Sequence, residues 1–163
     1  TGLDNLYLEQ LRAFGNVNRM PNERVITIAY YALISADDIQ FISQRSAKEV
    51  AWHPVSKLPE LVYDHAEIAK YGYEFIKKEM RHRPVGFELL PDKFTLLQLQ
   101  SVYECILNSK LDKGNFRRKI LNSRILLQCN ERQTGVNHRA ATLFKFDPNK
   151  YQELVNEGFS FVL

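Results

Sequence analysis

The order of apolar and polar positions predicts strands in the first part of the chain. Residues 7–14 alternate loosely between the two kinds, and a glycine follows them. Residues 24–34 are rich in β-branched and aromatic side chains and nearly continuous in apolar character, which predicts a strand buried on both faces. Polar residues, glycine and proline predict loops over residues 15–23 and 35–47.

A short strand and a helix follow. Residues 49–55 predict the strand, which Pro54 ends. The helix begins at Asp64, whose carboxylate can accept hydrogen bonds from free backbone N–H groups, and Glu67 three residues later gives an aspartate version of the capping box. Apolar side chains at helical spacing extend this helix to about Arg81.

Two prolines and one glycine in residues 83–92 predict a boundary between two domains. We therefore expect one domain over residues 1–83 and a second over residues 84–163. In the second, Thr95 and Gln98 form a capping-box pattern at the start of a helix.

A short connection then leads to a strongly basic helix over residues 113–122, with Asp112 or Asn115 as its cap. One apolar face of this helix is predicted from the spacing of Phe116, Ile120 and Leu121. The basic residues between them must therefore lie largely on or beside the outward face.

The chain continues with a predicted hairpin and a last helix. The hairpin consists of a strand over residues 124–128, a polar loop over 129–139 and a return strand over 141–146. Asp147 and Pro148 then begin a helix that ends at a glycine, Gly158. A helix, a short turn, a basic helix and a hairpin, in this order, are typical of a winged helix-turn-helix.

Composition excludes several classes of protein. Of the 163 residues, 45% are apolar and 25% are charged, which argues against wholesale disorder. The longest apolar run, Val25–Ile34, is too short to cross a bilayer, so no membrane partner is expected. The two cysteines, Cys105 and Cys129, have no CxxC spacing, so a disulfide framework and a cysteine zinc site are excluded and a cytoplasmic location is expected.

The net charge of +3 is unevenly distributed. Residues 1–80 carry a net charge of −2 and residues 81–163 a net charge of +5, which together give the total. Residues 110–150 contain ten basic and three acidic side chains, which gives a net charge of +7. This asymmetry suggests a polyanionic partner for the second half, and a solvated basic surface is the alternative.

Double-stranded DNA is the partner that the predicted winged helix suits, because one helix fits the major groove. Base contacts are expected from side chains that make two-pronged hydrogen bonds: Asn115, Arg117 and Arg118. Phosphate contacts are expected from ammonium groups: Lys110, Lys113 and Lys119. The hairpin adds Arg132, His138 and Arg139. For each of these residues, a role as a solvated surface residue remains the alternative.

The run from Trp52 to Leu121 resembles the NrtR-type family of Nudix-related transcriptional regulators. The resemblance is carried by Trp52, Pro54, Leu58–Pro59, Asp64–His65, Gly86–Phe87, Leu90–Pro91, Phe94–Leu96 and Asn115–Phe116–Arg117. It implies an α+β fold: a partial Nudix-like αβα sandwich that senses a ligand, followed by a winged helix. It also implies a ligand-responsive, homodimeric regulator with a pseudo-palindromic operator, and an effector that is ADP-ribose or a sugar such as arabinose.

In this family, the Nudix box is a glycine turn and a helix whose carboxylates hold Mg²⁺ against a diphosphate. These residues contain no such cluster, so we expect the chain to lack the box and the first strands, to need no cofactor, and to be no enzyme. Mg²⁺ would be expected only where a parent protein keeps the box. The alternatives are a Nudix hydrolase of ADP-ribose or a related nucleoside diphosphate, and an adaptor that docks an acidic protein. Ligand contacts are expected from Asn16, Asn18, Arg19, Trp52 and His53, and the alternatives are a solvated loop and a core tryptophan.

Overall fold

A computed structural model describes residues 8–34, 51–137 and 139–162. The chain divides into two compact units, Thr1–Ile76 and Lys77–Leu163. The predicted domains, 1–83 and 84–163, stay a prediction, since this division falls inside a single helix, α1 (His65–His82).

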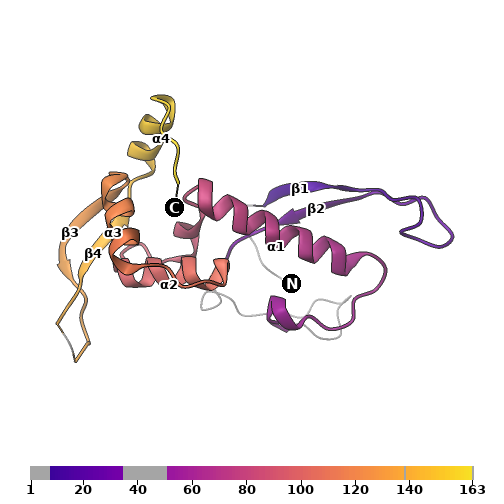
Figure 1. Cartoon of the computed structure of the whole chain (residues 1–163), viewed down its shortest axis with the longest axis horizontal. Coiled ribbons are helices and arrows are strands. Elements are labelled where there is room, and N and C mark those ends of the chain that lie inside the picture. Colours follow the sequence, from indigo (N-terminus) through magenta and orange to yellow (C-terminus); the bar gives the residue numbers. More distant parts are fainter. Residues whose placement is uncertain (1–7, 35–50, 138, 163) are drawn as a thin grey trace. The chain divides into compact units, whose positions relative to one another are not determined.

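In the N-terminal unit, two antiparallel strands pack against α1 (Figure 1). Strand β1 (Glu9–Phe14) pairs with β2 (Thr27–Tyr31), and turns connect them. Both lie within the strands predicted over residues 7–14 and 24–34. The rings of Phe14 and Tyr71 lie 5.7 Å apart, edge to face, and those of Tyr31 and Phe75 are equally close. These aromatic contacts attach one face of the hairpin to the helix.

The prediction that the second strand is buried on both faces is wrong. Ile28 and Tyr30 are 53% and 52% exposed, whereas Thr27 and Tyr31 are half-buried. Successive side chains of a strand point to opposite faces, and α1 covers only one of them in the described part of the chain. Apolar content therefore indicated the strand correctly but not its environment.

The strand predicted over residues 49–55 is also wrong where the structure describes it. Residues 51–54 are exposed and irregular, and Val55–Lys57 form a single 3-10 turn, η2. β-branched residues form a strand only where a partner supplies hydrogen bonds, and the amide of Pro54 cannot donate one. The loop predicted over residues 35–47 lies outside the described residues.

The C-terminal unit follows the predicted order of elements. Helix α2 (Leu96–Leu107) begins with the predicted capping box, in which Thr95 and Gln98 exchange hydrogen bonds. Helix α3 (Lys113–Asn122) has the predicted bounds, and Asp112 is its cap. Helix α4 (Pro148–Asn156) follows Asp147, whose side chain caps it.

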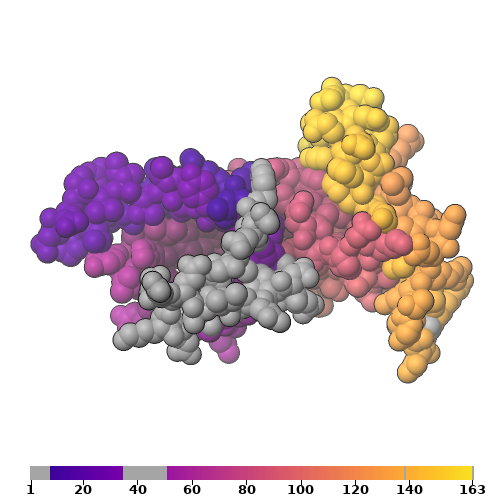
Figure 2. Space-filling view, turned by 180° about the vertical axis from the view of Figure 1, so that it is seen from behind, coloured from indigo at the N-terminus to yellow at the C-terminus, as the bar shows by residue number. Residues whose placement is uncertain are grey.

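The hairpin of this unit differs from its prediction. Strand β3 (Leu126–Arg132) pairs antiparallel with β4 (Thr142–Phe146), so β3 continues four residues into the predicted loop. The extension is polar, and its backbone is held by pairing between Arg132 and Thr142 rather than by burial. A pattern of apolar positions cannot predict a polar strand that is held by backbone pairing. The hairpin tapers to a narrow tip, seen in orange in Figure 2.

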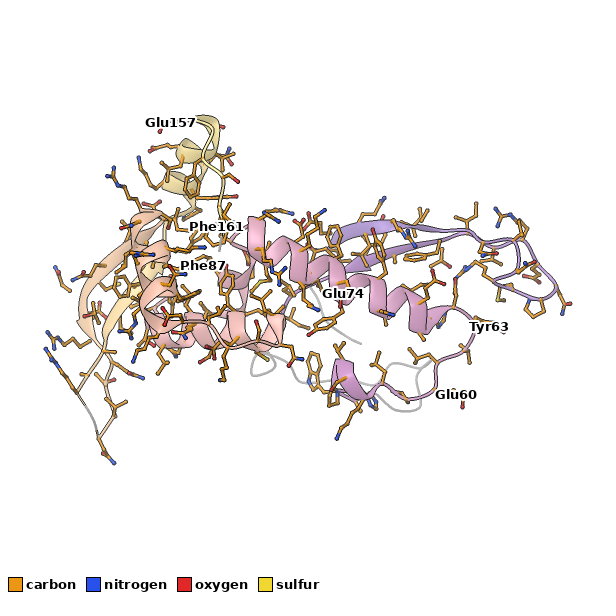
Figure 3. All side chains as sticks on the ribbon, in the orientation of Figure 1. Glu60, Tyr63, Glu74, Phe87, Glu157 and Phe161 are labelled. Atoms are coloured by element: carbon orange, nitrogen blue, oxygen red, sulfur yellow. The ribbon has the colours of Figure 1, made fainter. Side chains whose placement is uncertain are left out.

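Aromatic side chains fill the core of the C-terminal unit. Phe87 comes from the 3-10 helix η3 (Val85–Leu89) and stacks on Phe146, with 4.6 Å between ring centroids. Tyr103 is fully buried and contacts Phe116, with 5.8 Å between ring centroids. Figure 3 shows Phe87 and Phe161 approaching this core from segments outside α2 and α3. Leu121, predicted on the apolar face of α3, is instead 47% exposed, because Phe116 and Ile120 alone face inward.

Candidate functional site

Helix α3 presents a basic, exposed face. Its inward side is fixed by Phe116 and Ile120, which are 3% and 1% exposed. Four of the predicted DNA-binding side chains are exposed on the rest of the helix: Lys113, Asn115, Arg118 and Lys119. The helix N-terminus is capped because Asn115 N–H donates a 2.7 Å hydrogen bond to Asp112 Oδ1. A short, capped helix that buries only one side against its own protein can enter the major groove of DNA. Its exposed cationic face would then contact the DNA.

Two of these side chains are bonded to each other. Arg118 Nη2 donates a hydrogen bond of 2.8 Å to Asn115 Oδ1, across one turn of the helix. The bond orients both side chains in the free protein. Asparagine and arginine are also the side chains that form two-pronged hydrogen bonds with adenine and guanine.

Arg117 differs from its neighbours because its side chain is only partly exposed. Its Nε is buried, and no hydrogen-bond partner for it occurs among the described residues. Part of the Arg117 side chain therefore lies below the surface of the protein, unlike those of its basic neighbours on α3. The prediction that it lies beside the outward face agrees with this position.

Glu104 fixes the turn between α2 and α3. Its Oε1 accepts hydrogen bonds from the Leu111 amide at 3.0 Å and from Gln100 Nε2 at 2.9 Å. Its Oε2 accepts one from Lys110 Nζ at 3.0 Å. The hydrogen bond from the Leu111 amide, followed by those from Gln100 and Lys110, lowers the pKa of Glu104 to about 2. Lys110, predicted as a phosphate ligand, is 92% exposed but already paired.

The hairpin is tied to the segment before α2. Phe94 and Phe144 exchange two backbone hydrogen bonds, at 3.0 and 2.8 Å, as an antiparallel bridge. Lys93 Nζ binds both carboxylate oxygens of Glu131, at 2.6 and 2.7 Å, and this raises the pKa of Lys93. Of the predicted hairpin contacts, Arg132 and Arg139 are exposed, and His138 lies outside the described residues.

The N-terminal unit has an open hollow of about 780 Å³ beside the start of α1. It is lined by Arg12, Ala13, Phe14, Gly15, Asn16, Asn18, Arg19, Pro21, Tyr63, Asp64 and Glu67. Three predicted ligand residues, Asn16, Asn18 and Arg19, are thus brought together, whereas Trp52 and His53 do not line the hollow. Trp52 is 54% exposed, so it is not a core residue.

Two lining residues of the hollow, Arg19 and Asp64, form an ion pair. Arg19 donates from Nε to Asp64 Oδ2 and from Nη2 to Asp64 Oδ1, both at 2.8 Å, and from Nη1 to the Thr27 hydroxyl at 2.6 Å. These hydrogen bonds raise the pKa of Arg19 and lower that of Asp64. Asp64 directly precedes α1, as predicted, and its carboxylate accepts the bonds of a distant arginine.

Arg12 and Tyr63 are among the lining residues of the hollow that the sequence analysis did not propose. Arg12 sits in a strand, where a single charged residue is an ordinary surface feature. Tyr63 has a positive φ of 53°, and no pattern in the sequence indicates this conformation. Only the folded chain brings the two residues to one place.

Among the described residues, no three or more histidine, cysteine, aspartate or glutamate side chains form a group that could hold a metal ion. No helix in the described part of the chain is long and apolar enough to cross a membrane.

Comparisons with known proteins agree with this geometry. Residues 86–146 match the family described as the NrtR DNA-binding winged helix domain. The chain is 31% identical over 153 residues to the ADPR responsive transcriptional repressor NtrR of Acinetobacter baylyi. That alignment covers 93% of this chain and 60% of the repressor, so the chain spans less than two thirds of that relative.

Solved structures are similar as well. Shewanella oneidensis NrtR complexed with a 27mer DNA matches with a TM-score of 0.74 and 27% identity, over 95% of this chain and 68% of that one. A MutT/nudix family protein from Enterococcus faecalis matches in fold, with a TM-score of 0.62 and 22% identity, over 85% and 61% of the two chains. The predicted α+β fold, a Nudix-like part followed by a winged helix, is confirmed.

Proposed function

We propose that this chain, an NrtR-type Nudix-related protein, is a transcriptional regulator that binds double-stranded DNA and responds to a small-molecule effector. The observation that carries the proposal is the exposed cationic face of α3. This helix follows α2 in the chain and is followed by the β3–β4 hairpin. This is the arrangement that places a helix in the major groove.

The proposed contacts divide by chemistry. Asn115, Arg117 and Arg118 contact base edges, and Lys113 and Lys119 contact phosphates, because an ammonium group is a point charge. Lys110 is the weakest phosphate ligand of the set, since Glu104 already binds it. Arg132, His138 and Arg139 contact the phosphates or minor groove beside the helix.

The assembly is proposed to be a cytoplasmic homodimer. A dimer places two copies of α3 about one turn of DNA apart, and such a protein binds a pseudo-palindromic operator. The effector would bind more tightly to a domain arrangement in which the two α3 helices do not match the half-site spacing of the operator. Only such a difference in affinity can shift the equilibrium between the two arrangements.

The effector is proposed to be ADP-ribose, bound in the N-terminal unit. Two observations support this: the relative from Acinetobacter baylyi is an ADPR responsive repressor, and the hollow beside α1 is large enough for a small molecule. Asn16 and Asn18 of the predicted ligand residues line this hollow.

The test is fluorescence anisotropy with a duplex selected from a random pool, over a series of salt concentrations. We expect the affinity to fall steeply with salt, with a slope near −0.9 per phosphate contact, and ADP-ribose to release the duplex. A scrambled duplex and heparin are the controls. Equal affinity for heparin and the selected duplex would identify a general polyanion or acidic-protein binder and would reject the proposal.

A further inference from the structure

We propose that Lys93 is a positioning residue for DNA binding: its ion pair with Glu131 fixes an irregular stretch of β3 and thereby the direction of Arg132. This inference deepens the proposed function and rests on it, because it concerns how the hairpin is presented to DNA. The two strands of the hairpin, β3 and β4, are labelled in Figure 1.

Strand β3 contains extra residues near its end. Gln128 lies opposite Phe144, and the next pair along the hairpin is Arg132 with Thr142. Four positions separate these pairs on β3 and two separate them on β4, so β3 has two more residues than β4 in this interval. An irregularity of this kind bends a strand and redirects the side chains beside it. The direction of Arg132 therefore depends on how residues 129–131 are held.

Burial does not determine the conformation of residues 129–131. Asn130 and Glu131 are exposed, and Cys129 is half-buried. The register of a strand is strongly specified where one of its faces is buried and weakly specified where the strand is polar. A contact from outside the hairpin is therefore needed to select one register.

Lys93 supplies this contact. Its Nζ lies 2.6 and 2.7 Å from the two carboxylate oxygens of Glu131, which belongs to the irregular stretch. Lys93 is itself fixed, because the next residue, Phe94, is 1% exposed and exchanges two backbone hydrogen bonds with β4. A second ion pair, with 2.6 Å between Lys145 Nζ and Asp92 Oδ2, joins the same segment to β4. The segment before α2 thus holds both strands of the hairpin.

Arg132 directly follows the stretch that Lys93 fixes. Its side chain is exposed, and it has no hydrogen-bond or ion-pair partner among the described residues. Its guanidinium is therefore available to a phosphate. The carboxylate of Glu131 would repel the same phosphate, and Lys93 neutralises it. The ion pair therefore directs Arg132 and cancels the unfavourable charge beside it.

The first experiment measures the affinity of the whole chain for the selected duplex by anisotropy, comparing wild type with Glu131→Gln. Removing a negative charge from a DNA-binding surface ordinarily strengthens binding. Because Glu131 holds the bulge through Lys93, we expect the opposite, an affinity at least about threefold lower. Equal or tighter binding by Glu131→Gln would overturn the proposal.

Glu153→Gln is the matched control. It also removes the carboxylate of an exposed ion pair, 3.0 Å from Lys150 Nζ, but it lies in α4, outside the hairpin. Its affinity for the duplex should stay the same or rise. A loss as large as that of Glu131→Gln would show that any missing carboxylate weakens binding, and would overturn the specific role of Glu131.

The second experiment asks whether Lys93 acts through Arg132 or binds a phosphate itself. We expect Lys93→Gln to lower the affinity at least about threefold in wild type and less than about 1.5-fold in an Arg132→Ala background. The same fold loss in both backgrounds would identify a direct phosphate contact and reject a positioning role. The charge-swapped variant Lys93→Glu with Glu131→Lys restores the pair, so it should bind better than Lys93→Glu alone. Failure of this rescue would also overturn the proposal.

The third experiment follows the free protein and needs no DNA. The Gln133 amide donates a hydrogen bond of 2.9 Å to the Ala141 carbonyl, just beyond the irregular stretch. Its hydrogen exchange, measured by NMR, should be faster in Lys93→Gln and return towards the wild-type rate in the charge-swapped variant. Unchanged exchange in Lys93→Gln would overturn the inference alone. Failure of wild type to bind any selected duplex would reject the proposed function separately, whatever the exchange rates show.

Discussion

Arg118 Nη2 and Asn115 Oδ1 are joined by a 2.8 Å hydrogen bond on the exposed face of α3. The two side chains therefore form one polar unit before any DNA is bound. The exposed face of the helix carries cations on either side of this unit, at Lys113 and Lys119.

The bond predicts that the two residues act together. We expect Asn115→Ala and Arg118→Ala each to weaken operator binding, and the double variant to weaken it by less than the sum. The difference should be about 0.5–3 kcal/mol, as for residues in contact. Asn115→Ala combined with Lys119→Ala is the control pair. Additive losses for Asn115 and Arg118, measured by anisotropy, would contradict a shared role.

Salt dependence separates the lysines. Lys113→Ala should reduce the slope of log affinity against log salt by about 0.9, the effect of one lost phosphate contact. Lys110→Ala should reduce it clearly less, because Lys110 Nζ lies 3.0 Å from Glu104 Oε2 and is partly neutralised. Equal reductions in the two variants would show that DNA displaces Glu104 from Lys110.

Glu104 predicts a pH-dependent stability. Its pKa in the folded state is about 2, below the ordinary value of 4.5, so ionised Glu104 stabilises the fold above pH 4.5. This contribution is lost as the pH falls from 4.5 towards 2. Glu104→Gln should therefore lower the free energy of unfolding more at pH 6 than at pH 3 in denaturant titrations.

Lys110→Ala is the control for that experiment. It removes the ion pair but leaves Leu111 and Gln100 bonded to Glu104, so its effect on stability should be smaller. A stability difference between wild type and Glu104→Gln that stays constant from pH 6 to pH 3 would contradict the assignment.

Tyr103 predicts a stabilising substitution. Its side chain is fully buried, its hydroxyl has no hydrogen-bond partner in the described part of the chain, and burial raises its pKa. Tyr103→Phe removes this unpaired group, so the free energy of unfolding should stay the same or rise by about 1–3 kcal/mol. Phe116→Ala, which opens a cavity beside Tyr103, should lower it by about 3–5 kcal/mol. Destabilisation by Tyr103→Phe would indicate a hidden partner for the hydroxyl.

The elements that sequence predicted best have local causes. Thr95 and Gln98 form their capping box within four residues, and Asp112 caps α3 through an amide three residues away. These signals need no knowledge of the rest of the fold. The buried side of α3 also follows from spacing, as Phe116 and Ile120 show.

The errors have nonlocal causes. The burial of β2 depends on what covers each of its faces. The apolar character of Ile28 therefore could not show that this side chain is exposed. The polar end of β3 is a strand because Arg132 pairs with Thr142 across the hairpin. In the hollow, Arg19 binds Asp64, 45 residues away, a contact that no local pattern indicates; its role as a ligand residue stays a prediction.

A panel of operator duplexes with single base-pair substitutions tests whether α3 reads DNA bases. Affinities of wild type and Arg117→Ala are measured against every duplex. If α3 reads bases, Arg117→Ala should cost about 1–3 kcal/mol on the operator and lose discrimination at one base position only. Uniform weakening across the whole panel in Arg117→Ala, Arg118→Ala and Asn115→Ala would contradict it, because α3 would then contact phosphates alone.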